Sequence, residues 1–527
     1  MKSPNRAVRV LTSLAVVFAL GLSGCGTQSG SSTPVATNTQ TPDASASAQP
    51  ADSATPTPEP LEEVSLKVYL YTYMQETADT RKVLDEVNQI LKEKINATFD
   101  FTMDMVADAE KKIPLILASG ENYDGMMMRG MAQEVEKGGL MEIGDLLNTY
   151  SPERMKGMTD YDYTSITYNG KIYAAPGGFQ WFVPQGYVIR GDLRKKYNIP
   201  EVTDLASFQN YLEVLQEKEK GVIPFNTSAA DIITFGMNYL NAAGYVTLTG
   251  SAANTGLGYF MDDDKLTLSY AYELPQFKEY MAKTKEFADK GLWSKNAYAA
   301  KNISLDAFKA GASFAGACHV VNANDTAVIL KSKQPDWEVE FFRIQALTSR
   351  PTRGVGLAVP RVSKNPERLI MALEEIYTDE KLNTLLNYGI EGTHFTLSDG
   401  GKIINTEQGV SNYPAGQFPL VWSNININFM KQVEGGIPEL MDIQKKVDEY
   451  GYIPKHSGFN LNTEAISNEI SAISAVHTEF RPLYAFGAFD DADALIKEYK
   501  EKLEKAGAEK VKAEVQRQLD EFLASKK

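Results

Sequence analysis

The amino-acid sequence predicts an α/β fold in two large lobes, on two observations. Residues 64–101 have the pattern strand, helix, strand: apolar residues alternate in VSLKVYL and in ATFDF, and a helical stripe through Val83, Val87 and Ile90 lies between them. Such a βαβ unit is typical of a mainly parallel sheet. The second observation is the length, because 527 residues are too many for one compact core.

The N-terminus has the features of a secretory signal peptide. Three basic residues precede an apolar run over 10–22, which is shorter than the ~20 residues that a spanning helix needs. The run ends in LSGC, and this end resembles the lipobox of bacterial lipoproteins. The resemblance implies that a signal over 1–24 is removed and that Cys25 carries a lipid anchor. An ordinary secretory signal with an incidental Cys25 is the alternative.

A polar tract over 25–63 follows, rich in Ser, Thr, Pro and Ala. Beyond Cys25 it contains no aromatic residue, no Lys and no Arg. Such a segment cannot bury enough apolar surface to offset the entropy of ordering. We expect a disordered tether with a mean span of roughly 35 Å.

Composition excludes several classes of partner and site. The formal net charge is −15, which argues against nucleic acid and against anionic ligands, and favours a neutral or cationic partner. Lipidation of Cys25 would leave Cys318 without a disulfide partner, and we expect Cys318 to be a small buried hydrophobe. The four histidines are far apart and form no zinc-ligand motif. We therefore expect no metal, no cofactor and no catalytic residue.

Strand and helix patterns alternate through the rest of the chain. The patterns predict strands at 123–128, 170–176, 186–190 and 353–360, and helices at 110–120, 191–197, 205–221, 274–291 and 365–389. The segment from 490 to 527 is strongly helical, with an apolar stripe interrupted at Gly507.

Five segments, in this order, resemble the extracellular solute-binding proteins of ABC importers, the family that includes maltose-binding protein. They are ILASGENYDGMMM, YNGKIYAAPGGFQWF, YVIRGDLRKKYNIP, AFKAGASFAGACHV and RGVGLAVP. The tail from NTEAISNEISAISAVHTEF onward resembles a C-terminal extension of unassigned role on large Gram-positive lipoproteins of this family. The chain departs from maltose-binding protein in its greater length and in MMMR, which replaces a Trp in the first ligand loop.

The resemblance implies a periplasmic-binding-protein-like fold of type II, which closes on its ligand like a hinge. In this fold each lobe is a mainly parallel sheet flanked by helices, here with additional C-terminal helices. We place lobe one at 64–182 and 350–410. We place lobe two, with the C-terminal extension, at 183–349 and 411–527.

The function that the resemblance implies is transport rather than catalysis. A lipid-anchored monomer on the outer face of the cytoplasmic membrane, in a Gram-positive-like cell, would capture a sugar or oligosaccharide by hinge closure. It would deliver the ligand unaltered to ABC permease subunits, with no nucleic acid involved and with membrane contact through the lipid alone.

Candidate ligand contacts come from the segments expected at the cleft. A neutral, hydroxyl-rich ligand needs flat aromatic faces for its C–H surfaces and fixed polar groups for its hydroxyls. Trp181 lies in a Gly/Pro turn and is favoured as ligand-facing. Trp422, in a long apolar run, could equally be a core residue. A histidine that flanks a buried strand, such as His319, is more often a core residue, although its position at the strand slightly favours the cleft. The candidates are Tyr73, Gln75, Glu76, Met128, Arg129, Gln180, Trp181, Asn226, Thr227, Ser228, His319, Asn322, Asn324, Trp422 and Asn424.

Two other functional classes stay open on the sequence. An anchored extracellular glycoside hydrolase would need one pair of carboxylates, and the chain has 68 acidic residues from which a pair could form. Against a hydrolase, no GxSxG or metal motif is present, and the resemblance is to binding proteins. The third class is a peptide-binding or sensor accessory lipoprotein.

Overall fold

The computed structural model describes residues 61–526 apart from 159–161, 164–165, 169, 176–183, 294–296, 300–303, 345–347, 350–354 and 425. The predicted signal peptide, Cys25 and nearly all of the predicted tether therefore lie outside the described residues, as do Gln180 and Trp181. Of Arg129 the structure describes the backbone alone.

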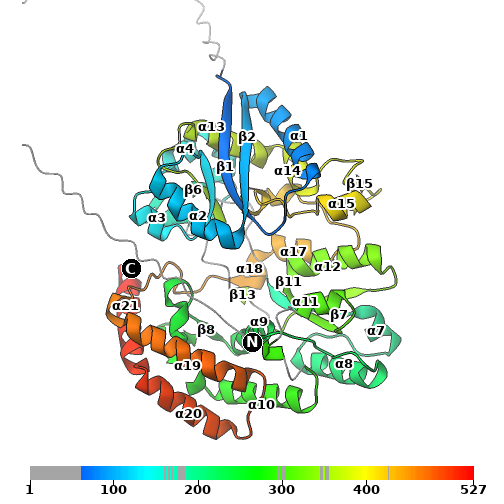
Figure 1. The fold of residues 1–527 in the computed structure, drawn as a ribbon, viewed down its shortest axis with the longest axis vertical. Coiled ribbons are helices and arrows are strands. Elements are labelled where there is room, and N and C mark those ends of the chain that lie inside the picture. The colour runs from blue at the N-terminus through cyan, green and yellow to red at the C-terminus, as the bar shows by residue number, and fades with distance from the viewer. Residues whose placement is uncertain are drawn as a thin grey trace, which may run out of the picture. The chain divides into compact units, whose positions relative to one another are not determined.

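A five-stranded sheet forms the centre of the first lobe (Figure 1). Strand β1 pairs in parallel with β2 and β3, whereas β14 runs antiparallel to β3 and to β6. The order across the sheet is β2 (Ala97–Met105), β1 (Val64–Thr72), β3 (Gly125–Arg129), β14 (Val355–Ala358) and β6 (Ala174–Ala175). The predicted βαβ unit at the start of the chain is confirmed.

Helix α1 (Ala78–Ile95) joins β1 to β2 and covers one side of this sheet. It begins at a capping box, in which the hydroxyl of Thr77 accepts the Thr80 N–H. The stripe through Val83, Val87 and Leu91 is fully buried against the sheet, as the helical spacing predicts.

The second lobe contains two small antiparallel sheets. In one, β7 (Gln185–Arg190) is flanked on both sides by antiparallel partners, β11 (Ala315–His319) and β12 (Val339–Phe342). The other has the order β10 (Ser269–Tyr270), β9 (Leu257–Phe260) and β8 (Tyr245–Thr247). The expectation of a mainly parallel sheet in this lobe is wrong for these two sheets, whereas the short pairing of β13 (Thr348–Ser349) with β17 (Gly451–Tyr452) is parallel. Residue alternation reports which face a side chain takes, not the direction of the neighbouring strand.

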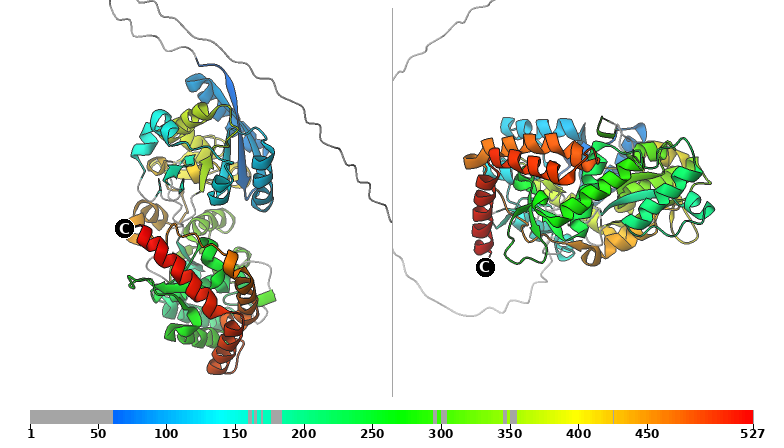
Figure 2. Two further views of the ribbon diagram at one scale, coloured as in Figure 1. Left: turned by 90° about the vertical axis from the view of Figure 1, so that its left-hand side faces the viewer. Right: turned by 90° about the horizontal axis from the view of Figure 1, so that it is seen from below.

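Three C-terminal helices complete the core of the second lobe (Figures 1 and 2). They are α19 (Ser467–Ala485), α20 (Ala492–Lys505) and α21 (Ala508–Ser525). Phe480 and Val515 belong to the same buried cluster as Phe235 and Tyr280, far earlier in the chain. The Tyr270 hydroxyl donates to the Ala508 carbonyl at 3.0 Å. The extension is thus part of this lobe.

Residues 413–422 pack into the first lobe, although the predicted boundary assigned 411–527 to the second. Tyr413, Phe418, Leu420 and Trp422 belong to the buried cluster around the first sheet. An apolar run such as FPLVW predicts burial but carries no information on which of two cores buries it. The other lobe boundaries remain predictions.

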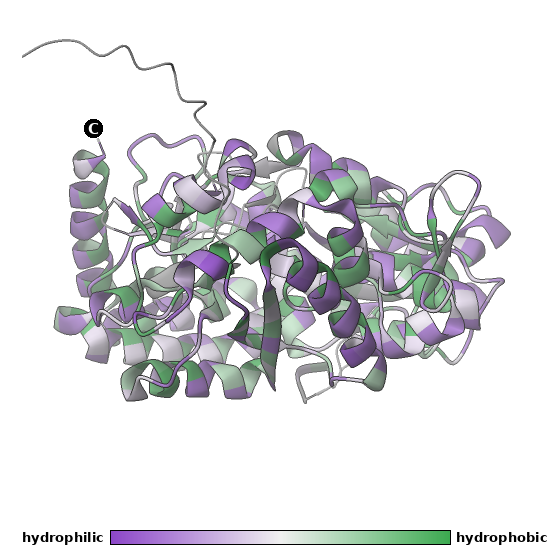
Figure 3. Ribbon diagram, turned by 90° about the horizontal axis from the view of Figure 1, so that it is seen from above, coloured by the Kyte–Doolittle hydropathy of each residue, from purple (hydrophilic) through white to green (hydrophobic). Residues whose placement is uncertain are grey.

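The remaining elements are short or lie on the surface of the two lobes. Many of the helices carry hydrophilic and hydrophobic residues in alternation, including α21 beside the C-terminus (Figure 3). Among the described residues, no helix combines the length and apolar character that crossing a membrane requires. The bounds are α2 (Val106–Ser119), α3 (Ala132–Glu136), α4 (Gly144–Tyr150), α5 (Pro152–Lys156), β4 (Thr167–Tyr168), β5 (Lys171–Ile172), α7 (Gly191–Lys196), α8 (Leu205–Lys218), α9 (Ala229–Ala242), η1 (Gly250–Thr255), η2 (Ala271–Glu273), α10 (Pro275–Asp289), η3 (Ala297–Ala299), α11 (Ser304–Lys309), α12 (Val320–Lys333), β13 (Thr348–Ser349), α13 (Pro366–Thr378), α14 (Glu380–Tyr388), β15 (Phe395–Leu397), β16 (Ile403–Asn405), α15 (Glu407–Asn412), α16 (Val421–Asn424), η4 (Ile427–Phe429), α17 (Glu439–Lys445), α18 (Val447–Tyr450), β17 (Gly451–Tyr452) and η5 (Glu464–Ile466).

Candidate ligand-binding site

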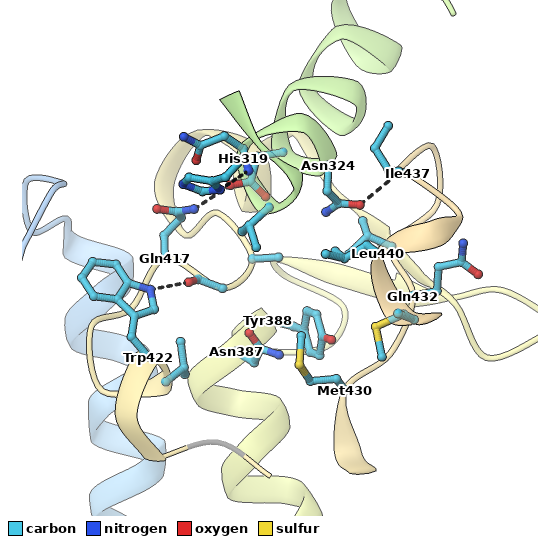
Figure 4. A pocket seen from close by; sticks show the side chains of 18 of the residues that line it. His319, Asn324, Asn387, Tyr388, Gln417, Trp422, Met430, Gln432, Ile437 and Leu440 are labelled. Atoms are coloured by element: carbon cyan, nitrogen blue, oxygen red, sulfur yellow. Dashed lines mark hydrogen bonds between the residues drawn. The ribbon is translucent and has the colours of Figure 1, made fainter. Parts of the chain in front are cut away.

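A cavity of about 620 Å³ lies where residues of the two lobes meet (Figure 4). Lobe one lines it with the residue after β1, the end of α14, the loop before α16 and α16 itself. Lobe two lines it with the first residue of β7, the start of α12 and the start of α17. The segment 430–433 connects the two walls.

Two aromatic side chains form one end of the cavity. The indole Nε1 of Trp422 donates to the Gly416 carbonyl at 2.9 Å, which fixes the ring. The ring of Tyr73 lies 5.5 Å from that of Trp422 between centroids, inclined at 46°, and Tyr71 supports the indole from 6.1 Å. Tyr73 is 49% exposed and Trp422 is 8% exposed. The pair presents aromatic surface to whatever fills this end.

The imidazole of His319 faces the same cavity from the second lobe. His319 caps the N-terminus of α12, where its Nδ1 accepts the Asn322 backbone N–H at 3.2 Å. Nε2 therefore carries the hydrogen and is a donor. Burial lowers the pKa of His319 to about 4, so the ring is neutral at pH 7.

Two further polar residues of α12 line the cavity and contact neighbouring segments. The Asn324 Oδ1 accepts the Ile437 backbone N–H at 3.0 Å, and the Asn324 side chain also hydrogen-bonds to Asp325. The Asp325 Oδ2 accepts from Gln417 Nε2 of the first lobe at 2.8 Å. Burial raises the pKa of Asp325 to about 7, although Asn324, Lys309 and Gln417 oppose the shift.

The opposite end of the cavity is mostly aliphatic. The Tyr388 hydroxyl donates to the Lys431 carbonyl at 2.9 Å and accepts the Lys431 N–H at 2.8 Å, so the segment after η4 is held along α14. The Lys431 Nζ is paired with Glu380 at 2.7 Å. Apolar side chains cover the wall beyond, namely Met430, Val433, Ile437, Leu440 and Met441.

Five of the predicted contacts meet around this cavity: Tyr73, His319, Asn322, Asn324 and Trp422. Gln75 and Glu76 line a separate hollow of about 40 Å³ in the first lobe, where Glu76 forms an ion pair with Arg81. Whether any of these residues touches a ligand stays a prediction.

Other predicted contacts lie away from the cavity, each for a local reason. Met128 is buried in β3, a central strand covered on both faces. Ser228 caps α9 through Asp231, and Thr227 is buried beside it. The backbone N–H of Asn226 donates to Ser313 Oγ at 2.9 Å. Asn424 is fully buried, and its Nδ2 donates to Ser423 Oγ at 2.9 Å.

Seven polar residues of the cavity lining were not among the predicted contacts: Gln185, Asp325, Asn387, Tyr388, Gln417, Lys431 and Gln432. Gln417 begins the segment QFPLVWSNINI, in which Trp422 and Asn424 were the predicted contacts, and Gln185 directly precedes the predicted strand at 186–190. Asn387 lies in the last turn of a helix, within LLNYG, where its neighbours follow an ordinary amphipathic pattern. No local pattern distinguishes these positions, because the packing of the two lobes brings them together.

Within the part of the chain that the structure describes, no group of three or more His, Cys, Asp and Glu side chains could hold a metal ion. The residues that line the cavity supply hydrogen-bond donors, acceptors and apolar surface. These groups suit reversible binding of a neutral polar molecule.

Known proteins resemble the chain over nearly all of its length. A "Carbohydrate ABC transporter substrate-binding protein" of Streptococcus pneumoniae serotype 4 (strain ATCC BAA-334 / TIGR4) is 26% identical, with 97% of each chain covered. Residues 455–524 match a family model described as "Domain of unknown function (DUF3502)". That range includes all three C-terminal helices except the last residue of α21.

Solved structures agree on the fold. The N-glycan transport solute binding protein (NgtS) from Streptococcus pneumoniae superposes with a TM-score of 0.74 at 24% identity, covering 88% of this chain and 100% of that one. The same protein in complex with Man1GlcNAc gives 0.64 at 23% identity, over 88% and 100%. These neighbours have the two-lobed architecture described above.

Proposed function

We propose that this chain, a member of the solute-binding proteins of ABC importers with their two-lobed type II fold, captures a sugar or oligosaccharide and delivers it to an ABC permease. One observation carries the proposal: an aromatic pair from the first lobe and a polar helix start from the second lobe face the same cavity. The 26% identical relative named for carbohydrate transport supports it.

The two walls suit the two kinds of surface that a saccharide presents. The rings of Trp422 and Tyr73 offer flat faces for C–H surfaces, as sugar rings require. The polar side chains of His319, Asn322 and Asn324 at the start of α12 line the same cavity and can hydrogen-bond to hydroxyl groups. A ligand that touches both walls favours the state in which the lobes are closed, because it binds that state more tightly.

The location that we propose is the outer face of the cytoplasmic membrane, with the lipid on Cys25 as the anchor. The tract over 26–63 then separates the binding unit from the membrane by roughly 35 Å on average. Replacing Cys25 with serine in the producing cell tests this location. We expect the protein to leave the membrane fraction and to appear in the medium; retention at the membrane would contradict the anchor.

The ligand class that we propose is a glycan with mannose and N-acetylglucosamine units. NgtS is similar over the whole binding unit and has been crystallised with Man1GlcNAc and with Man5GlcNAc. A volume of about 620 Å³ lies within the range that small-molecule sites occupy, roughly 300–1,000 Å³. It accommodates a short saccharide.

The function is tested by binding and recovery of an intact ligand. Full-length protein in detergent is melted with a panel of mono-, di- and oligosaccharides, and with peptides. A ligand at 100 times its Kd should stabilise the protein by about 2.7 kcal/mol. Chromatography of the recovered ligand separates binding from hydrolysis: released products, or stabilisation by peptides alone, would contradict the proposal.

A further inference from the structure

Two asparagines one turn apart in α14 differ in their hydrogen bonding. The amide of Asn383 is used at both ends: Nδ2 donates to the Ile376 carbonyl, and Oδ1 accepts the Asn426 N–H at 3.1 Å. The Nδ2 of Asn387 is buried and has no partner among the described residues. Asn387 as a whole is 2% exposed and lines the cavity. A buried donor without an acceptor costs free energy, unless a ligand supplies the acceptor.

Asn387 lies between the two ends of the cavity (Figure 4). Its backbone carbonyl accepts the Gly416 N–H at 2.7 Å, and the Gly416 carbonyl in turn accepts from Trp422. On its other side the next residue, Tyr388, bonds to the backbone of Lys431, which follows Met430. The donor of Asn387 therefore has aromatic surface on one side and apolar side chains on the other.

The apolar end is unsuited to bare hydroxyl groups. Met430, Val433, Leu440 and Met441 line it, with Gln432 as a polar neighbour, and Leu440 and Val433 are each 9% exposed. A hydroxyl pressed against such side chains loses hydrogen bonds to water without compensation, whereas a methyl group gains from the same contact. Lys431 does not make this end a site for an anionic group, because its Nζ is already paired with Glu380.

We propose that this end of the cavity is a subsite for the acetamido group of an N-acetylated amino sugar. The carbonyl oxygen of the acetamido group accepts from Asn387 Nδ2, and its methyl group packs against Met430 and Leu440. The sugar ring then lies toward Trp422 and Tyr73. The inference rests on the proposed function. It adds that the acetamido group determines which sugars bind and that Asn387 recognises this group.

The test compares two ligands that differ at one position, mannosyl-N-acetylglucosamine and mannosyl-glucose. Calorimetry on the full-length protein in detergent gives both dissociation constants. We expect the acetamido ligand to bind on the order of tenfold more tightly, the effect of one well-placed group. Equal affinities within twofold would overturn the subsite and leave the proposed function intact.

Three variants separate recognition from folding. Asn387→Leu removes the donor and keeps the side-chain size, and Leu440→Phe fills the apolar end. Each should reduce the preference to less than about threefold, mainly by weakening the acetamido ligand. Asn383→Leu is the matched control, which should lower the melting temperature and keep the preference.

The outcomes distinguish the two proposals. An Asn387→Leu protein with the full wild-type preference would overturn the role of Asn387. Binding of other saccharides in the panel but of neither disaccharide would overturn the acetamido subsite alone. Failure of every saccharide to bind the wild-type protein would overturn the proposed function and the subsite with it.

Discussion

The two lobes complete their cores in different ways. The buried cluster of the first lobe draws on segments between 64 and 430 and, among the described residues, on none beyond them. The cluster of the second lobe includes buried residues of all three C-terminal helices. The segment that matches a domain of unknown function is therefore a structural part of one lobe, and its removal should affect the lobes unequally.

The lobes also differ in the polar groups that hold their last segments in place. In the first lobe the buried carboxylate of Asp79 accepts from Gln408 and from Asn412, each at 2.8 Å, and from Lys82 at 2.7 Å. The Nε2 of His394 lies 3.6 Å away. These bonds lower the pKa of Asp79, chiefly through Lys82, and they hold α15 against α1.

In the second lobe, neutral histidines are the buried polar groups that hold neighbouring segments together. The Nδ1 of His456 is 2.8 Å from the Tyr259 hydroxyl, and its Nε2 is 3.1 Å from the Thr249 hydroxyl. The Nδ1 of His477 lies 2.5 Å from the Tyr499 hydroxyl. Burial lowers the pKa of both rings to about 4. One lobe thus depends on a buried charge and the other on rings that must stay uncharged.

The largest expected effect follows from truncating the chain after Pro454. Removing α19, α20 and α21 exposes the buried aromatic surface around Phe235 and Tyr280, so the second lobe should lose more than roughly 5 kcal/mol and fail to fold. Hydrogen exchange measures each lobe separately. We expect backbone amides to stay protected from exchange in the first lobe, for example in β1, β2 and α1, and to lose protection in the second lobe. Protection of both lobes in the truncated chain would show that the second core does not depend on the C-terminal helices.

The next effect in size belongs to the first lobe. Asp79→Asn leaves three donors around a neutral amide and should lower the free energy of unfolding by roughly 3 kcal/mol. Urea denaturation measures the loss. Asp85→Asn, at an exposed position of the same helix, is the control and should change it by less than about 0.5 kcal/mol. Equal effects of the two variants would show that the Asp79 cluster is not a structural centre.

Acid should act on the second lobe through His456. Its folded pKa of about 4 is below the ordinary value of 6.5, so the unfolded chain binds a proton first as the pH falls. Stability is therefore complete above about pH 6.5 and is lost toward pH 4, by about 2 kcal/mol at pH 5. Urea denaturation at pH 7.5 and pH 5 measures this loss.

His456→Gln isolates the contribution of this ring, since glutamine keeps hydrogen-bonding capacity and does not titrate. The pH-dependent loss in the variant should be smaller than that of the wild type by about 2 kcal/mol. An identical pH dependence of stability in both proteins would show that protonation of His456 does not cause the loss of stability at low pH.

The smallest effect concerns the exposed ring of the cavity. Tyr73→Ala removes a side chain that is 49% exposed, so folding should be unaffected while saccharide affinity falls about tenfold. Calorimetry and a thermal melt measure the two separately, with Tyr73→Phe as the control that keeps the ring. An unchanged affinity in the alanine variant would exclude Tyr73 from the aromatic end of the site.

The sequence predicted the helices and strands more completely than it predicted the lining of the cavity, for reasons visible at particular residues. His319, Asn322 and Asn324 line the cavity and were predicted near it. The local sequence pattern was sufficient for these residues, because it shows where a strand ends and a helix begins. Ser228, a predicted ligand contact, caps α9 through Asp231 and is not part of the cavity lining, and its spacing to Asp231 is that of a capping box. Asn387 and Gln417 carry no local pattern, since their place depends on contacts between lobes.

The central claim is that a saccharide holds the two lobes together, and an inter-lobe distance tests it most directly. Spin labels at Leu115→Cys, 69% exposed in α2, and Met237→Cys, 48% exposed in α9, report on opposite lobes in a Cys25→Ser chain. Cys318 should stay unlabelled, because it is buried and burial raises its pKa to about 12. We predict a shorter and narrower distance distribution as mannosyl-N-acetylglucosamine saturates the protein. An unchanged distribution at calorimetric saturation would contradict the account.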